Sequence, residues 1–230
     1  MTGRLRRALR RVQRDDRGIT MSELLVAMSL FTVLLVIVGG TFVSITRATT
    51  FAAARDQNTR SAQNGMNELS RKLRAAADNP VANAADTPAF SAAAADALTV
   101  STLVATGRDA VPQLASFSVT GGTLVETVTA GRAVGTYFVF DGARSSSRLV
   151  DGVDPAPSGS SPLFTYFDST GTELVPPTPA GLTADQRGRI STVTVTLSVA
   201  NSRSTLQNGI VLQSSIGLPN LLDLTQGNTP

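Results

Sequence analysis

Glu23 is the residue with the clearest chemical consequence, because it precedes a long stretch without any other charge. From Leu24 to Ile45 the chain has 22 residues that include no Asp, Glu, Lys or Arg. A charged side chain drawn to the centre of a membrane costs about 2.5–3.5 kcal/mol, so a carboxylate beside such a segment needs a reason. One reason is ordinary, since the helix dipole favours an acidic residue at a helix start. The other reason is a pairing role for the charge.

Catalytic chemistry finds little support, because the chain contains no cysteine and no histidine. Disulfides, cysteine-based zinc sites and a Ser-His-Asp triad are excluded, and the commonest general base near neutral pH is missing. The G-x-x-x-x-G-K-[ST], G-x-G-x-x-G and G-x-S-x-G motifs are also lacking. Asp151 and Asp154 beside Gly152 are compatible with calcium, but a solvated turn is the commoner explanation. We therefore expect no enzyme, no cofactor and no metal site.

The basic charge is confined to the N-terminus. Seven arginines lie in residues 1–18 against Asp15 and Asp16, which gives this segment a net charge of +5. Because the whole chain carries +3, residues 19–230 carry 3 − 5 = −2. A basic surface is the electrostatic signature of nucleic-acid binding. We therefore expect the body of the protein to bind no nucleic acid.

The apolar run after Glu23 is long enough to cross a membrane. A helix of this length spans roughly 33 Å, which exceeds the thickness of the hydrocarbon core. The arginine-rich flank before it predicts a cytoplasmic N-terminus and an exported C-terminal body. A cleavable secretory signal would have a shorter apolar core followed by a small-residue cleavage site. The apolar run here is longer than such a core, and residues 42–45 are a poor cleavage site of that kind. A plain signal anchor fits the length but leaves Glu23 unexplained.

The residues from Arg17 to Ala27, RGITMSELLVA, resemble the class III signal of type IV prepilins. That signal has a basic leader ending in Gly, an apolar first mature residue, Glu at the fifth mature position and then an unbroken apolar helix. Gly18, Ile19 and Glu23 occupy these positions, although Ile19 replaces the more common Phe. The resemblance implies that a prepilin peptidase cuts between Gly18 and Ile19 and that the new Ile19 amine is N-methylated. It also implies that Glu23 neutralises the N-terminal ammonium of a neighbouring subunit in a filament.

The helix is expected to continue well past the apolar run, to about Ala77. Its polar face is predicted to hold Lys72, and Asp78-Asn79-Pro80 is a stop signal. Gly39-Gly40 lowers helix stability by about 1 kcal/mol per residue relative to alanine. Close helix packing and a flexible point during assembly both explain that pair. Four apolar residues recur at spacings of three and four and predict a buried stripe: Met66, Leu69, Leu73 and Ala76.

The remainder of the chain predicts short antiparallel strands. Residues 81–97 are expected to form a loop or a weak helix, and Gly121-Gly122 a hairpin turn. The segments 154–162 and 176–188 are expected to be loops. The fold class is therefore α+β and pilin-like, with a long N-terminal helix packed on a C-terminal antiparallel sheet. The expected strands are 97–104, 113–120, 123–129, 134–140, 163–167, 190–199 and 206–216.

A second resemblance involves the body. Residues 149–153, 164–168 with Gly171, 190–197 and 216–221 resemble the family that includes W-type minor pilins and the J-type minor pseudopilin of type II secretion. Pro219 replaces an Arg often found before the Asn of that family's C-terminal segment. A generic sheet with a Phe/Tyr core explains the same residues nearly as well.

These observations predict four segments: a cleaved leader (1–18), a transmembrane and assembly helix (19–46), an amphipathic spine (47–79) and an exported β-rich domain (80–230). The implied function is that of a minor pilin or pseudopilin, which initiates or caps a type IV pilus or a type II secretion-like pseudopilus. Its implied partners are prepilin peptidase, other major and minor pilins or pseudopilins, and the bacterial cytoplasmic membrane. The alternative is a signal-anchored extracytoplasmic binding or adhesion domain that joins no filament.

Overall fold

A computed structural model describes residues 18–79, 86–105, 110–135, 137–154, 162–177, 180–199 and 209–222. The chain divides into two compact units, Met1–Ala52 and Ala53–Pro230. The predicted leader therefore lies outside the described residues apart from Gly18.

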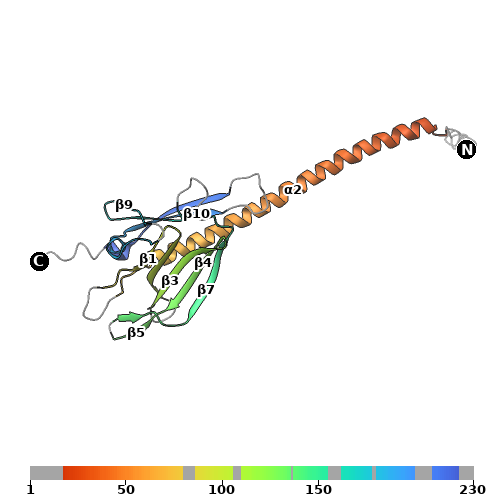
Figure 1. Cartoon of the computed structure of the whole chain (residues 1–230). Helices are drawn as coiled ribbons and strands as arrows, with labels where there is room; N and C mark the ends of the chain where they lie inside the picture. The colour runs from red at the N-terminus through yellow and green to blue at the C-terminus, as the bar shows by residue number, and fades with distance from the viewer. Residues whose placement is uncertain are drawn as a thin grey trace, which may run out of the picture. The chain divides into compact units, whose positions relative to one another are not determined.

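One helix, α2 (Met21–Arg74), contributes to both units (Figure 1). It is long and apolar enough near the N-terminus to cross a membrane, by length and composition. Hydroxyl side chains in its first half donate to the helix's own backbone: Thr32 Oγ1 to Met28 O at 2.8 Å and Thr41 Oγ1 to Ile37 O at 2.9 Å. These hydroxyls are therefore satisfied without water, as a lipid environment requires. The helix runs without interruption through Gly39 and Gly40.

The second half of α2 packs its apolar stripe against the sheets of the second unit. The predicted residues Met66, Leu69, Leu73 and Ala76 are all buried in the core, as is Ala62. Lys72 corrects the prediction of a polar face, because it is only 5% exposed and lies on the buried side of the helix.

The helix ends at Arg74, earlier than the predicted Ala77. Residues after Arg74 pair with a strand instead of continuing the helix. Leu103 N donates to Ala75 O at 2.9 Å, and Ala77 N donates to Ser101 O at 3.0 Å. Strand pairing therefore satisfies backbone groups at the helix end that would otherwise lack partners.

A five-stranded antiparallel sheet lies on one side of this half of α2 in Figure 1, with the strand order β1-β2-β3-β4-β7. The expected hairpin turn is confirmed, because Gly121 and Gly122 connect β3 and β4 with φ of +57° and +72°. Such angles favour glycine strongly. The strands are β1 (Phe90–Ala93), β2 (Ala97–Ala105), β3 (Ala110–Thr120), β4 (Thr123–Ala130) and β7 (Arg144–Asp151).

A four-stranded antiparallel sheet, with the order β11-β10-β8-β9, lies on the other side. Its inner residues share one apolar core with α2 and the five-stranded sheet. Tyr166 lies in this core and donates to Ala94 O at 2.7 Å. The strands are β8 (Phe164–Phe167), β9 (Glu173–Leu174), β10 (Thr192–Val199) and β11 (Ile210–Gly217).

Several strand predictions are confirmed, and others are wrong for identifiable reasons. The strand expected over 134–140 is instead a small hairpin, β5 (Arg132–Val134) and β6 (Tyr137–Val139), because Gly135 turns the chain with φ of +67°. The segment 81–97, expected to be a loop or weak helix, contains β1. The expected loop 176–188 contains the short helix α3 (Ala184–Gly188), whose capping box joins Thr183 and Gln186. Residues 206–208 of the last predicted strand and 155–161 of an expected loop lie outside the described residues.

Candidate functional site

The predicted processing point is open to solvent in the structure. Gly18 and Ile19 precede the first helical residue, and Ile19 is 75% exposed. A Cβ added at Gly18 would have no atom within 4 Å. The fold itself therefore gives no steric reason for glycine at position 18, and recognition by another molecule would supply one.

Thr20 and Glu23 form a reciprocal cap at the start of α2. Glu23 N donates to Thr20 Oγ1 at 3.3 Å, while Thr20 N donates to Glu23 Oε2 at 3.0 Å. Thr20 Oγ1 also donates to Glu23 Oε2 at 3.0 Å. This arrangement is a capping box, in which two backbone donors at a helix start find side-chain acceptors. Sequence reasoning singled out Glu23 but missed Thr20, although the spacing Thr-x-x-Glu signals such a cap.

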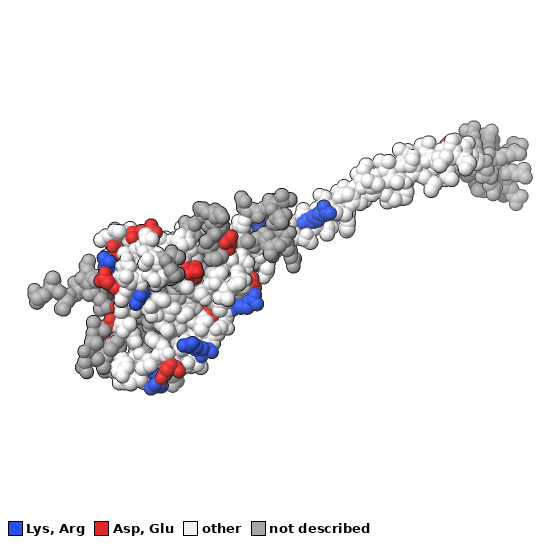
Figure 2. Space-filling model, viewed as in Figure 1, with Lys and Arg blue, Asp and Glu red and all other residues white. Residues whose placement is uncertain are grey.

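The helix surface that follows this cap is almost entirely apolar. Leu24, Phe31 and Val36 are exposed by 53%, 60% and 69%, and other large side chains to Ile45 show similar exposure. Figure 2 shows this part of α2 as a nearly uninterrupted uncharged surface. A continuous apolar patch of this kind indicates contact with lipid or with other proteins. Lipid or packed helices would therefore have to cover it.

Residues 13–39 match the prokaryotic N-terminal methylation motif. This match contains Gly18, Ile19, Thr20 and Glu23 together with the first part of the apolar helix. It supports a type IV pilin-like protein with a prepilin-type leader, and the long helix followed by antiparallel sheets is a pilin-like α+β arrangement. The apolar helix fits a single-pass membrane anchor. No curated protein matches the chain.

The body residues of the second resemblance occupy ordinary structural positions. Residues 149–153 run from the end of β7 to an isolated bridge between Val153 and Val199, and residues 164–168 form β8 and the turn after it. Asn220, near the C-terminal end of that resemblance, donates to Ala76 O at 3.3 Å and therefore helps to satisfy the carbonyls beyond α2. Its role in the structure is that of a cap for the helix spine.

The acidic residues considered for calcium are arranged differently from a cation site. Asp151 Oδ1 accepts from Thr123 Oγ1 at 2.9 Å and pairs with Arg148 at 2.6 Å. These contacts hold the pKa of the Asp151 carboxyl below its usual value, the hydrogen bond from Arg148 having the largest effect. Within the described ranges, no group of three or more Asp, Glu, His or Cys side chains is placed to hold a metal ion.

Proposed function

We propose that the chain is a non-enzymatic structural subunit, a minor pilin or pseudopilin that initiates or caps a type IV pilus or a type II secretion-like pseudopilus. The observation that carries the proposal is the coincidence of Gly18, Ile19 and Glu23 with an exposed, charge-free helix inside a methylation motif. The W-type or J-type resemblance of the body favours a minor role over that of the major subunit.

Processing supplies the physical driving step of the proposed mechanism. The leader, with its charge of +5, holds the N-terminus at the cytoplasmic face. Prepilin peptidase removes it at Gly18–Ile19, and the Ile19 amine is methylated. Glu23 then pairs with the N-terminal ammonium of another pilin as the apolar helix exchanges lipid for neighbouring helices. A charge pair is stronger in such a low-dielectric environment than at a protein surface.

Intact-mass measurement and N-terminal sequencing of the protein from its native host test this function. The expected product lacks residues 1–18 and has a methylated Ile19. The variant Gly18→Val should remain uncut, because the prepilin signal has glycine at the end of the leader. It should still insert into the membrane, because the structure has open space for a side chain at that position. Cleavage beyond Ile45 or an uncut wild-type chain would contradict the proposal.

The alternative, a signal-anchored extracytoplasmic binding or adhesion domain, is favoured by one observation. The Thr20–Glu23 cap gives Glu23 a use within its own chain, so the residue is explained without a filament. An uncut chain that stays in the membrane as single copies would support this alternative.

A further inference from the structure

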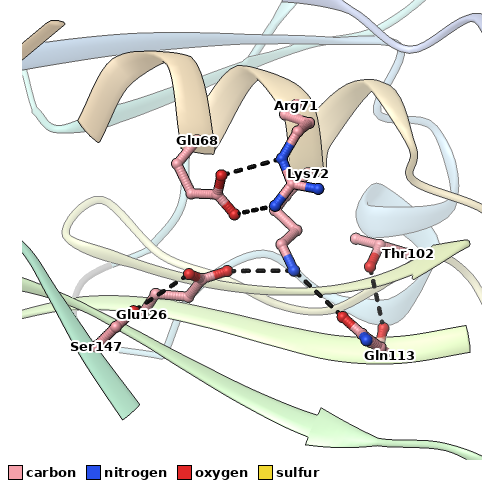
Figure 3. A network of polar contacts seen from close by, with 7 residues as sticks. All are labelled: Glu68, Arg71, Lys72, Thr102, Gln113, Glu126 and Ser147. Carbon is pink, nitrogen blue, oxygen red and sulfur yellow. Dashed lines mark hydrogen bonds and ion pairs between the residues drawn. The ribbon is translucent and has the colours of Figure 1, made fainter. Parts of the chain in front are cut away.

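Lys72 and Glu126 form an ion pair inside the second unit rather than on its surface. Lys72 Nζ lies 3.5 Å from Glu126 Oε1, and the two side chains are only 6% and 7% exposed. Lys72 Nζ also donates to Gln113 Oε1 at 3.2 Å, and Ser147 Oγ donates to Glu126 Oε2 at 3.4 Å. Figure 3 shows the lysine reaching from α2 to two strands of the five-stranded sheet.

This pair is poorly suited to increasing stability. Glu126 Oε1 is buried and, within the described part of the chain, accepts no hydrogen bond, so its contact with Lys72 is purely a charge interaction. Desolvation offsets much of the attraction in buried pairs, and apolar replacements of similar volume are often neutral or stabilising. An arrangement that separates the two charges, however, would leave each of them buried without a partner, which is strongly unfavourable. What the pair can contribute is therefore the penalty for any arrangement that separates its two charges, rather than a gain in stability from forming it.

The preceding residue on the helix is prevented from competing for Glu126. Arg71 is held by Glu68, which accepts from Arg71 Nε at 3.0 Å and from a second guanidinium nitrogen (Figure 3). A rotation of α2 by one residue, about 100°, would move Arg71 toward the position of Lys72. Because Glu68 lies on the same helix and would turn with Arg71, the rotated helix would bring an arginine already paired with Glu68 to Glu126 in place of Lys72. The four charges therefore favour one rotation.

A steric contact on the same helix face has the same effect. A Cβ added at Gly65 would lie 2.3 Å from Val150 Cγ2, so the helix approaches β7 more closely there than a side chain allows. Gly65 and Lys72 are seven residues apart, which is close to two turns or about 10.5 Å along the axis. Any other residue turned toward Val150 would collide with it.

We propose that Gly65 and Lys72 together form a rotational key that holds the second half of α2 in one orientation on the five-stranded sheet. The apolar stripe turns one broad side of α2 toward the core, and the backbone bonds of Ala75 and Ala77 to β2 fix where the helix ends. Apolar contacts alone, however, tolerate repacking and therefore small rotations of the helix about its axis. The consequence in a filament, one constant face of the spine presented to neighbouring subunits, rests on the proposed function. The key itself does not.

Spin-label distance measurements on the full-length protein in detergent test this key. The cysteine-free chain allows one label at Asn67→Cys on α2 and one at Arg144→Cys on β7, both exposed positions. We expect one narrow distance distribution for the otherwise wild-type protein. In the apolar double variant K72M/E126M we expect a broadened or two-peaked distribution, with an unfolding midpoint equal to or above that of the wild type. The double variant R132Q/D141N removes an exposed ion pair and should leave the distribution narrow.

Two results would overturn the proposal. A narrow, unchanged distance in K72M/E126M would show that the pair does not set the rotation. A lowered unfolding midpoint or failure to fold in that variant would show that the pair serves stability instead. Because the measurement uses unassembled protein, neither result depends on processing or on filament formation, which the mass measurement on native protein tests separately.

Discussion

At the residue scale, the two explanations for Glu23 are compatible in one side chain. Its Oε2 accepts both bonds from Thr20, while Oε1 makes no hydrogen bond among the described residues. One oxygen therefore caps the helix of its own chain and leaves the other for an ammonium group. Ile19, whose amine would be released by processing, is the residue directly before Thr20.

Substitutions at Thr20 and Glu23 separate capping from assembly. Thr20→Ala removes the hydroxyl that caps α2 but keeps the carboxylate, so we expect normal filament incorporation with some fraying of the first turn. Glu23→Ala keeps the Thr20 hydroxyl but removes the carboxylate, which accepts from Thr20 N and would pair with the ammonium group. We expect unchanged membrane insertion with at least a tenfold loss of incorporation, which corresponds to about 1.4 kcal/mol of lost pairing. Quantitative immunoblotting of sheared filaments against membranes measures this ratio. Equal losses in the two variants would mean that Glu23 acts only as a cap.

At the element scale, the second half of α2 is defined by a contact that a residue pattern does not reveal. The spacing of Met66, Leu69 and Leu73 predicts which side of the helix is buried, because these residues are apolar and recur every three or four positions. Gly65 and Lys72 lie on that side for other reasons, close approach to Val150 and pairing with Glu126. Neither contact can be predicted from the helix sequence alone, because Val150 and Glu126 belong to strands of the sheet.

The variant Gly65→Ala tests the close approach of α2 to β7. Overpacking costs about 1–3 kcal/mol, whereas replacing a helical glycine gains at most about 1 kcal/mol. We therefore expect a net loss of about 1 kcal/mol in the free energy of unfolding, measured by denaturant titration. Asn64→Ala on the exposed side of the same helix should instead give a small gain.

A second substitution shows whether the contact with Val150 is responsible. In Gly65→Ala/Val150→Ala the shortened side chain makes room for the new methyl group, so the combined loss should be smaller than the sum of the two single losses. Strict additivity would indicate that the two residues do not interact.

At the scale of the whole molecule, processing is expected to reverse the sign of the charge. The uncut chain has an isoelectric point near 10.1. Removal of residues 1–18 takes away +5 and leaves −2, with no histidine to buffer the difference. We therefore expect the mature protein to focus below pH 7 and the Gly18→Val precursor to focus near the basic end. A mature form that still focuses above pH 9 would mean that the leader is retained.

Local signals predicted most elements of the fold. The apolar run and the Asp78-Asn79-Pro80 stop bracket α2 to within a few residues, and Gly121-Gly122 predicted the hairpin between β3 and β4 because the turn needs positive φ. The strand β7 was missed because its Arg-Ser-Ser-Ser-Arg sequence has no apolar alternation and it lies at a sheet edge. The division into two sheets was also missed, since strand order depends on long-range pairing rather than on local pattern.

The candidate site shows the same division between local and distant information. Gly18, Ile19 and Glu23 lie within six residues, so the spacing that identifies them can be recognised from the sequence alone. Lys72 and Glu126 are separated by more than fifty residues, and an unpaired lysine on a helix is normally assigned to the solvent side. The pairing of Lys72 with Glu126 is therefore identified only from the folded structure.

The burial of Lys72 also determines which amines the protein offers to its surroundings. The chain contains no other lysine, so a processed subunit would have two reactive amines, the primary amine of Lys72 and the methylated secondary amine at Ile19. The first is enclosed between the helix and the sheet. Acylating reagents and amine cross-linkers would then modify the folded subunit only at its N-terminus, and a lysine-specific protease would reach its single cleavage site only when α2 separates from the sheet.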